Sequence, residues 1–269
     1  MRLGVARPDS FGEMPLEYND LMRDGNTMQF ILDVHCHTVN SGHAYSTVTE
    51  NAAHGAGVGL THIGIADHGP GMPAGAHLYN FTNIWVLPEF MHGVRVLKGA
   101  EANIISDTGK LDLPSDVLKK LDFVIASFHR GSFPPIDRDT HTRAMIMAME
   151  NPNMHILGHP GDCWFDIDAE AVVRAAARTG TVIEINNASL NPGSVRYHGD
   201  SSLRQILFFC KKFNTKVLAS SDAHYHTYVG DLARAKQLIE ESGIDEYLVL
   251  NTSAERFLET IYLKRSLVT

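Results

Sequence analysis

Cysteine is scarce in this chain, and long apolar runs are missing altogether. Only three cysteines occur among the 269 residues, namely Cys36, Cys163 and Cys210. An odd and widely spaced set of this kind argues against a disulfide framework and is typical of the reducing cytoplasm. No apolar stretch approaches the ~20 residues of a transmembrane helix, and the N-terminus lacks a secretory pattern. We therefore predict a cytoplasmic protein with no membrane partner.

Positive charge is also in short supply. Lys and Arg number 23 against 31 Asp and Glu, which leaves a net charge of −8. An acidic surface repels a polyphosphate backbone, so a nucleic-acid partner is not expected. The chain also lacks a glycine-rich phosphate loop after its first expected strand, which argues against a dinucleotide-binding fold. The one residue type in clear excess is histidine, with 15 copies.

Short apolar runs alternate with amphipathic runs along most of the chain, and this alternation predicts a parallel sheet covered by helices. The expected strands, β-branched or small and apolar as buried parallel strands are, are Phe30–Val34, His62–Ala66, Val94–Ala100, Phe123–Ser127, His155–Gly158, Thr181–Ile185 and Lys216–Ser220. The expected helices are Thr47–Gly57, Thr142–Glu150, Ala169–Arg178, Ser202–Phe213, Leu232–Ser242 and Ser253–Tyr262.

Seven such units in a chain of this length predict one α/β domain, a distorted seven-stranded (β/α)7 barrel of the TIM-barrel type. The hydrophobic content of 44% and charged content of 20% agree with a globular protein. We place the barrel at residues 30–269. Residues 1–29, broken by prolines and glycines, are expected to form an N-terminal extension with a short helix near Leu16–Arg23.

The first expected strand ends in two histidines. Side chains alternate along a strand, so His35 and His37 point the same way and Cys36 points to the opposite face. Two imidazoles on one face form a ready bidentate site for zinc, iron or manganese. A His-x-His pair alone also fits a satisfied polar network, so the interpretation depends on what the other strands carry.

Every other expected strand also ends in a polar group. In barrel enzymes the active site lies at the C-terminal face of the strands, so these groups are expected to meet there. The nine candidate metal ligands are His35, His37, His43, His68, Glu101, His129, His159, Asp222 and His224. One catalytic ion takes about three protein ligands, so this set predicts two to three divalent ions. A carboxylate can bridge two ions, which makes Glu101 and Asp222 the bridging candidates.

The remaining eight histidines are expected to be surface or packing residues, because they fall on helices, at strand starts or in loops. They are His54, His62, His77, His92, His141, His155, His198 and His226.

The motifs at the strand ends, taken in order, resemble those of the PHP (polymerase and histidinol phosphatase) family. The stretches His43–Thr47, Ala66–Pro70, Glu101–Ile104 and Glu184–Asn187 are similar to those of its YcdX-type phosphatase branch. The resemblance covers roughly Leu32 to Thr260. It implies a distorted seven-stranded barrel, a metal cluster at the strand C-termini and phosphoester hydrolysis.

Carried over residue by residue, the resemblance implies three ions. His35, His37, Glu101 and Asp222 would hold the first ion, and these four are the predicted catalytic residues. Glu101 would bridge to a second ion held by His129 and His159. His43, His68 and His224 would hold the third.

A phosphomonoester dianion needs charge neutralisation and a nucleophile at neutral pH, and clustered divalent ions supply both. We therefore predict a metal-dependent phosphatase that hydrolyses small phosphomonoesters with a metal-activated hydroxide at a trinuclear site. Zinc is the favoured metal, with manganese or iron as alternatives. Other open interpretations are a phosphodiesterase or nuclease, an amidohydrolase-type hydrolase and a non-catalytic metal-binding module. The sequence does not determine the oligomeric state, and a homo-oligomer is compatible with it.

Overall fold

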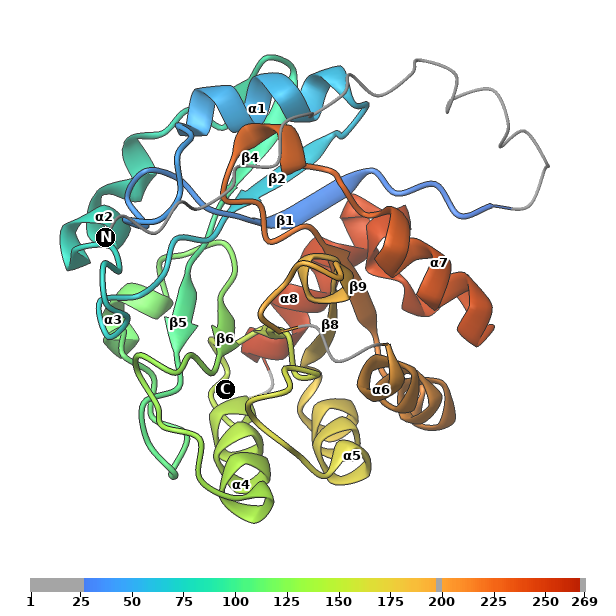
Figure 1. The fold of residues 1–269 in the computed structure, drawn as a ribbon. Helices are drawn as coiled ribbons and strands as arrows, with labels where there is room; N and C mark the ends of the chain where they lie inside the picture. Colours follow the sequence, from blue (N-terminus) through green and yellow to red (C-terminus); the bar gives the residue numbers. More distant parts are fainter. Residues whose placement is uncertain (1–26, 197–199, 267–269) are drawn as a thin grey trace, which may run out of the picture.

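The computed structural model describes residues 27–196 and 200–266, whose arrangement is shown in Figure 1. The strands lie in the interior, and helices surround them on the outside. The predicted extension at residues 1–29 falls almost wholly outside the described residues. It therefore stays a prediction, as does its short helix near Leu16–Arg23.

The described strands form two sheets. The first has the order β1 (Leu32–Cys36), β2 (His62–Ile65), β4 (Val94–Lys98) and β3 (Phe90–Met91). The second has the order β5 (Glu101–Asn103), β6 (Ile125–Ser127), β7 (Ile156–Leu157), β8 (Val182–Asn186) and β9 (Val217–Ser220). All neighbouring pairs are parallel except β3 and β4, which are antiparallel.

The two sheets meet through single bridges rather than through continuous ladders. Cys36 at the end of β1 bridges to Ala223 beyond β9, and His68 beyond β2 bridges to Glu101 at the start of β5. The prediction of an α/β fold with parallel strands is therefore confirmed. A single closed sheet of seven strands is not, because the described residues form nine strands in two sheets.

The division between the sheets falls inside one predicted strand. The sequence predicts a single strand over Val94–Ala100, but β4 ends at Lys98 and β5 begins at Glu101 in the other sheet. Gly99 lies at the crossing, where a Cβ atom would collide with the ring of Phe123. Glycine permits this close approach of backbone and ring. The crossing places Glu101 at the end of the molecule where the other strands finish.

Six α-helices of the described chain lie between successive strands, and two more follow β9. They are α1 (Val48–Gly57), α2 (Leu78–Asn83), α3 (Ser115–Leu118), α4 (Arg138–Met149), α5 (Ala169–Thr179), α6 (Ser201–Phe213), α7 (Ala233–Ser242) and α8 (Ala254–Ser266), all within the described residues. Short 3-10 turns lie at η2 (Ile84–Val86), η3 (Ala188–Leu190), η4 (His226–Tyr228), η5 (Glu246–Leu248) and η6 (Leu250–Thr252).

The helix ends follow local capping chemistry. Thr47 and Glu50 form a capping box at the start of α1, as side chains at these positions commonly do. Helix α4 begins at Arg138, four residues before the predicted start, because the side chain of Asp137 accepts from the backbone N–H of Thr140. Helix α5 ends at Thr179, and the Gly180 that caps it adopts the left-handed conformation that glycine tolerates best.

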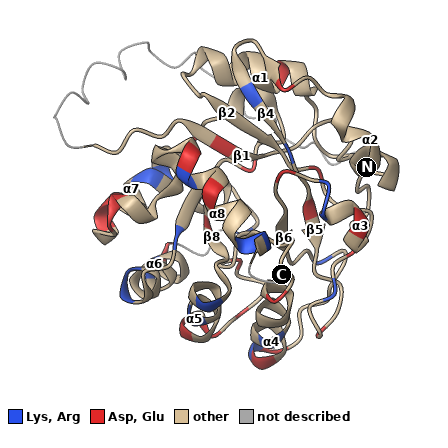
Figure 2. Cartoon of the chain, turned by 180° about the vertical axis from the view of Figure 1, so that it is seen from behind, with Lys and Arg blue, Asp and Glu red and all other residues tan. Residues whose placement is uncertain are grey.

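Helix α8 closes the end of the fold where the strands begin. Phe257 and Ile261 of this helix pack with Leu32, Phe123 and other apolar residues near the strand starts. Burying one phenylalanine side chain stabilises a fold by roughly 1.5–3 kcal/mol. In Figure 2, charged residues lie mainly on the outer helices and the strands are largely uncharged. The end where the strands finish is left open for polar groups.

Candidate metal-binding site

The structure brings all nine predicted ligands together where the strands finish. His35 and Glu101 lie in β1 and β5, and the other seven lie in the segments that follow the strands, namely His37, His43, His68, His129, His159, Asp222 and His224. Six of the nine are buried, whereas His43 is exposed and His129 and His224 are intermediate. Such a concentration of buried ionisable groups is costly unless each has a partner.

The carboxylate of Glu101 lies at the centre of five imidazoles. Its Oε2 atom is 2.6 Å from His68 Nδ1, 3.4 Å from His35 Nε2 and 3.6 Å from His37 Nε2. Its Oε1 atom is 2.9 Å from His159 Nε2 and 3.3 Å from His129 Nε2. The two oxygens therefore face different imidazoles, which is the arrangement that a bridging carboxylate requires.

Asp222 supplies the second buried carboxylate. Its Oδ1 atom is 3.1 Å from His37 Nε2 and 3.6 Å from His35 Nε2. Its Oδ2 atom accepts from the guanidinium of Arg196, which reaches in from the segment after β8. The backbone of Asp222 has a φ of 56°, and that of His159 has a φ of 28°. Such strained conformations in residues other than glycine are concentrated at functional sites.

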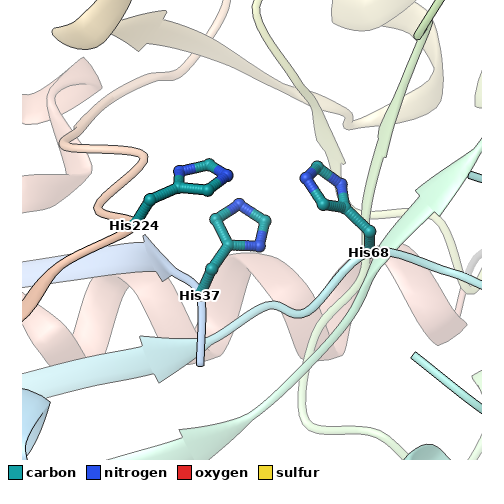
Figure 3. A group of neighbouring side chains, drawn as sticks. All are labelled: His37, His68 and His224. Carbon is teal, nitrogen blue, oxygen red and sulfur yellow. The ribbon is translucent and has the colours of Figure 1, made fainter. Parts of the chain in front are cut away.

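Three imidazoles form a second group within the cluster, and His37 and His68 in it are buried. Figure 3 shows His37, His68 and His224 with their rings turned toward a shared space. The ring of His37 lies 4.3 Å from those of both His68 and His224, measured between centroids. His43 joins them, with its Nε2 atom 2.9 Å from His224 Nε2.

Two observations indicate that these side chains are suited to bind a metal ion. Three groups each offer ligand atoms within 4.8 Å of one another, namely His37, His68 and His224, then His35, His37 and Asp222, and then His68, Glu101 and His129. Buried ligand atoms also lack hydrogen-bond partners among the described residues: Nε2 of His35 and His129, both ring nitrogens of His68, and Oε2 of Glu101. Unpaired buried polar atoms are expensive, and bound metal ions would satisfy Nε2 of His35 and His129, one ring nitrogen of His68 and Oε2 of Glu101.

Outer contacts hold several rings with one nitrogen turned inward. Nδ1 of His35 lies 2.6 Å from Oε1 of Glu184, and Nδ1 of His129 lies 2.8 Å from Oδ1 of Asn103. Both oxygens can only accept, so both Nδ1 atoms carry the proton and leave Nε2 free. Metal-binding histidines are held by contacts of this kind.

Protonation states follow from the crowding of charges. Burial is the largest influence on Glu101 and would raise its pKa, but His129, His68 and His35 together hold this pKa well below its usual value. Burial lowers the pKa of His129 to about 4, and burial with the nearby His224 lowers that of His43 to about 4. These two imidazoles are therefore neutral and Glu101 is ionised near pH 7, as metal ligands must be.

The charged neighbours of His35 and Asp222 shift the pKa values of these two residues in opposite directions. Burial would lower the pKa of His35, but Glu184, Asp222 and Glu101 raise it well above its usual value. Burial would raise the pKa of Asp222, but Arg196 and His35 hold it well below its usual value. The carboxylates around His35 thus favour a positive charge at this position, which an ion held by Nε2 would supply while the proton stays on Nδ1.

Two residues that the sequence analysis left without a role belong to this site. Glu184 entered the sequence analysis only within the Glu184–Asn187 stretch of the family resemblance, yet it holds His35 and also accepts from the backbone N–H of His159 at 2.6 Å. Arg196 lies in a segment with no motif of its own, so no local signal pointed to it. By contrast, Cys36 lies buried in the apolar cluster of the first sheet, on the side that strand alternation predicts.

Most of the other histidines lie elsewhere, as predicted. His141 is buried and binds the backbone at Ile136 and Asp166, and His155 is buried and accepts from the backbone N–H of Val124. Both therefore have structural roles. His198 lies outside the described residues.

Comparison with known proteins places the chain among phosphatases. It is 43% identical over 238 residues to a "Probable phosphatase" of Acetivibrio thermocellus, which covers 88% of this chain and 97% of the relative. It is 46% identical over 238 residues to a probable phosphatase of Thermoanaerobacter sp., covering 88% and 96%. A probable phosphatase of Caldanaerobacter subterraneus subsp. tengcongensis is 43% identical over 245 residues, covering 91% and 96%. The chain belongs to this family of phosphatase enzymes.

Solved structures resemble the fold at much lower identity. Histidinol phosphate phosphatase from Lactococcus lactis, solved with zinc, L-histidinol and phosphate, has a TM-score of 0.58 at 18% identity, covering 80% of this chain and 94% of that one. A chain of archaeal ribonuclease P with mature tRNA has a TM-score of 0.55 at 16% identity, covering 88% and 92%. These likenesses show the fold alone. No protein-family model matches the chain, and no helix among the described residues is long and apolar enough to cross a membrane.

Proposed function

We propose that this enzyme is a metal-dependent phosphatase that hydrolyses small phosphomonoesters at a centre of two to three divalent ions. The observation that carries the proposal is the position of Glu101. Its carboxylate is fully buried, faces imidazoles with both oxygens and has an oxygen without a hydrogen-bond partner among the described residues. The identity to probable phosphatases over most of the chain supports the same reaction class.

The first ion would be held by His35, His37, Glu101 and Asp222, the second by Glu101, His129 and His159, and the third by His43, His68 and His224. His68 stands between the last two sets, because its Nδ1 contacts Glu101 and its ring lies 5.0 Å from that of His43, measured between centroids. When bound, such ions lower the pKa of coordinated water and neutralise phosphoryl oxygens. Zinc is the favoured metal, since imidazole is the main ligand type, with manganese or iron as alternatives.

The protein contributes preorganisation and charge. Glu184 and Asn103 keep the rings of His35 and His129 turned so that Nε2 faces the cluster. Arg196 brings a guanidinium to the cluster beside Asp222, where its donors can bind an oxygen of the substrate phosphate. Burial of both carboxylates strengthens every electrostatic interaction at this point.

The alternatives are less well supported. The family of probable phosphatases weighs against a non-catalytic module and against amide hydrolysis. An amidohydrolase-type barrel usually bridges its ions with a carboxylated lysine after the fourth strand, whereas His129 occupies this position here. The finer assignment to the YcdX-type branch of the PHP family agrees with the motif order and is part of this proposal.

The test is metal analysis of the purified full-length enzyme, followed by comparison of p-nitrophenyl phosphate with bis-p-nitrophenyl phosphate. We expect two to three ions per chain, faster turnover of the monoester, and loss of activity on chelation that zinc, manganese or iron restores. His35→Ala should lose metal and activity, whereas His54→Ala, on the outer helix α1, should keep both. Active protein with only trace metal, or a preference for the diester, would contradict the proposal.

A further inference from the structure

The side chain of Asn103 connects the candidate metal site to a polar group outside it. Asn103 lies two residues after Glu101 on β5 and is fully buried. Its Oδ1 atom lies 2.8 Å from Nδ1 of His129. Its Nδ2 atom donates to Oδ2 of Asp112 at 2.6 Å and to the carbonyl of Gly69 at 3.2 Å.

The chemistry of these partners determines which way the amide points. A carboxylate and a backbone carbonyl can only accept, so the NH2 group of Asn103 must face Asp112 and Gly69. Its carbonyl oxygen must then face His129 and, being an acceptor, needs the proton on Nδ1 of that ring; it also accepts from Oγ of Ser132 at 3.2 Å. The amide orientation therefore decides which nitrogen of His129 carries the proton.

Asp112 is held in place to do this. Its carboxylate also accepts from the backbone N–H groups of Asn103 and Gly71, each at 2.8 Å. There is little free space beside it, because a Cβ atom on Gly69 would collide with both of its oxygens. The carboxylate is thus held by donors of the segment after β2 and of β5 itself.

We propose that Asp112 is a positioning residue that acts through the Asn103 amide to keep the proton of His129 on Nδ1, leaving Nε2 free as a ligand beside Glu101. The inference rests on the proposed metal site. Nε2 of His129 is buried, lies 3.3 Å from Oε1 of Glu101 and has no hydrogen-bond partner among the described residues. With the amide turned over, Nε2 would carry the proton and could not bind an ion.

A purely structural role for Asp112 predicts a loss of stability and nothing more. The positioning role predicts a change of tautomer at His129, which long-range proton–nitrogen NMR reads directly in the metal-free, full-length protein. The His129 ring signals are assigned by their absence in His129→Gln. This readout does not depend on phosphatase activity, so the positioning role and the proposed function can fail separately.

We expect wild-type His129 to be the Nδ1–H tautomer. Asp112→Ala should shift it toward Nε2–H, and Gly69→Ala should do the same by displacing the carboxylate without removing its charge. Asp107→Ala is the matched control, because Asp107 is an exposed aspartate five residues earlier that contacts Arg143. Asp112→Ala should also weaken zinc binding by about 10- to 100-fold in a chelator competition, as loss of outer contacts at metal sites does.

The proposal is overturned if wild-type His129 is the Nε2–H tautomer, a result that needs no variant to fold. It is also overturned if folded Asp112→Ala and Gly69→Ala both keep the Nδ1–H tautomer. A different outcome is that the tautomer shifts as expected in a protein whose wild type binds no metal and turns over no phosphomonoester. In that case the proposed function fails, but the positioning of His129 by Asp112 through the Asn103 amide stands.

Discussion

Oε2 of Glu101 lies 2.6 Å from Nδ1 of His68, yet the two atoms are not in hydrogen-bond geometry. On the other side of the same carboxylate, Oε1 lies 2.9 Å from Nε2 of His159. The close pair of Glu101 Oε2 and His68 Nδ1, two ligand atoms without a hydrogen bond between them, fits two side chains that share a metal ion. The proposed bridging role of Glu101 follows from this relationship.

Glu101→Gln should nearly abolish activity and remove more than one ion. The substitution takes away the negative charge that offsets two neighbouring dications and weakens the bridge between them. We expect kcat to fall by about 100-fold or more, since even supporting residues of metal sites contribute 10- to 100-fold. Metal stoichiometry and kcat are the measurements. Full metal content with near-normal kcat would show that Glu101 does not bridge the ions, and Asp222 would become the next candidate for this role.

His68→Ala is the comparison for the bridging variant. In the three-ion assignment it disturbs only the third ion, so it should lose about one ion and keep measurable turnover. The contact of His68 with Glu101 makes this a sharp test. Loss of two or more ions from His68→Ala would show that His68 serves the second ion as well.

Glu184→Gln should weaken metal binding although Glu184 is not a predicted ligand. Glu184 accepts from Nδ1 of His35 with one oxygen and from the backbone N–H of His159 with the other. A glutamine has one oxygen, so its NH2 group would face one of these donors. We expect metal affinity to fall by about 10- to 100-fold in a chelator competition. Glu255→Gln, on the surface of α8, is the matched control, and equal affinity in both variants would refute the role.

Arg196→Met should impair substrate binding more than metal binding. The guanidinium contacts Asp222 at the cluster and is proposed to bind the substrate phosphate. Hydrogen bonds to charged groups contribute about 1.5–3 kcal/mol, which corresponds to a loss in kcat/KM of roughly 10- to 100-fold, carried mainly by KM. Steady-state kinetics with metal analysis measures this, with Arg204→Met on the outer face of α6 as control. An unchanged KM would exclude the phosphate-binding role.

The buried Lys264 should make the free energy of unfolding increase with pH in the alkaline range. Its side chain is 3% exposed, and its Nζ donates to the carbonyls of Met149 and Thr179 and to Oγ1 of Thr181. Burial lowers its pKa from the ordinary 10.5 to about 8. Below pH 8 both the folded and unfolded chains hold the proton, and between pH 8 and 10.5 only the unfolded chain does. Because the unfolded state then binds more protons, stability from this group rises with pH.

The measurement compares the wild type with Lys264→Met by denaturant unfolding from pH 7.5 to 10.5. The free energy of unfolding of the wild type relative to the variant should increase by about 3 kcal/mol over this window, from the size of the pKa shift. Taking the difference between the two proteins cancels the titration of other groups. A difference that stays constant with pH would show that Lys264 titrates normally in the folded protein.

The candidate site was readable from the sequence because its signals are local. A buried strand is recognised by its own apolar residues, and the polar residues that follow it are next to it in the chain. Parallel strands finish at the same end, so the residues after seven expected strands had to approach one another. For this reason all nine proposed ligands, from His35 to His224, could be named from the sequence.

The sequence predicted the fold class correctly, but it did not predict that the strands form two sheets instead of one closed sheet. The alternation of strands and helices predicted parallel sheets, which the structure confirms. Where the predicted Val94–Ala100 strand divides between two sheets, the ring of Phe123 lies so close to Gly99 that a Cβ atom there would collide with it. This contact joins residues that are well separated in the chain, and the apolar pattern of Val94–Ala100 is the same with or without it.

The sequence alone determined which residues could bind metal, because ligand chemistry and strand-end position are properties of each residue and its neighbours in the chain. Only the tertiary structure decided how those residues are oriented and charged. The proton of His35 depends on Glu184, which is 149 positions away, and that of His129 depends on an amide held by Asp112. Hydrogen bonds and charge interactions act over a few ångströms in space, and packing determines which distant residues come within that range.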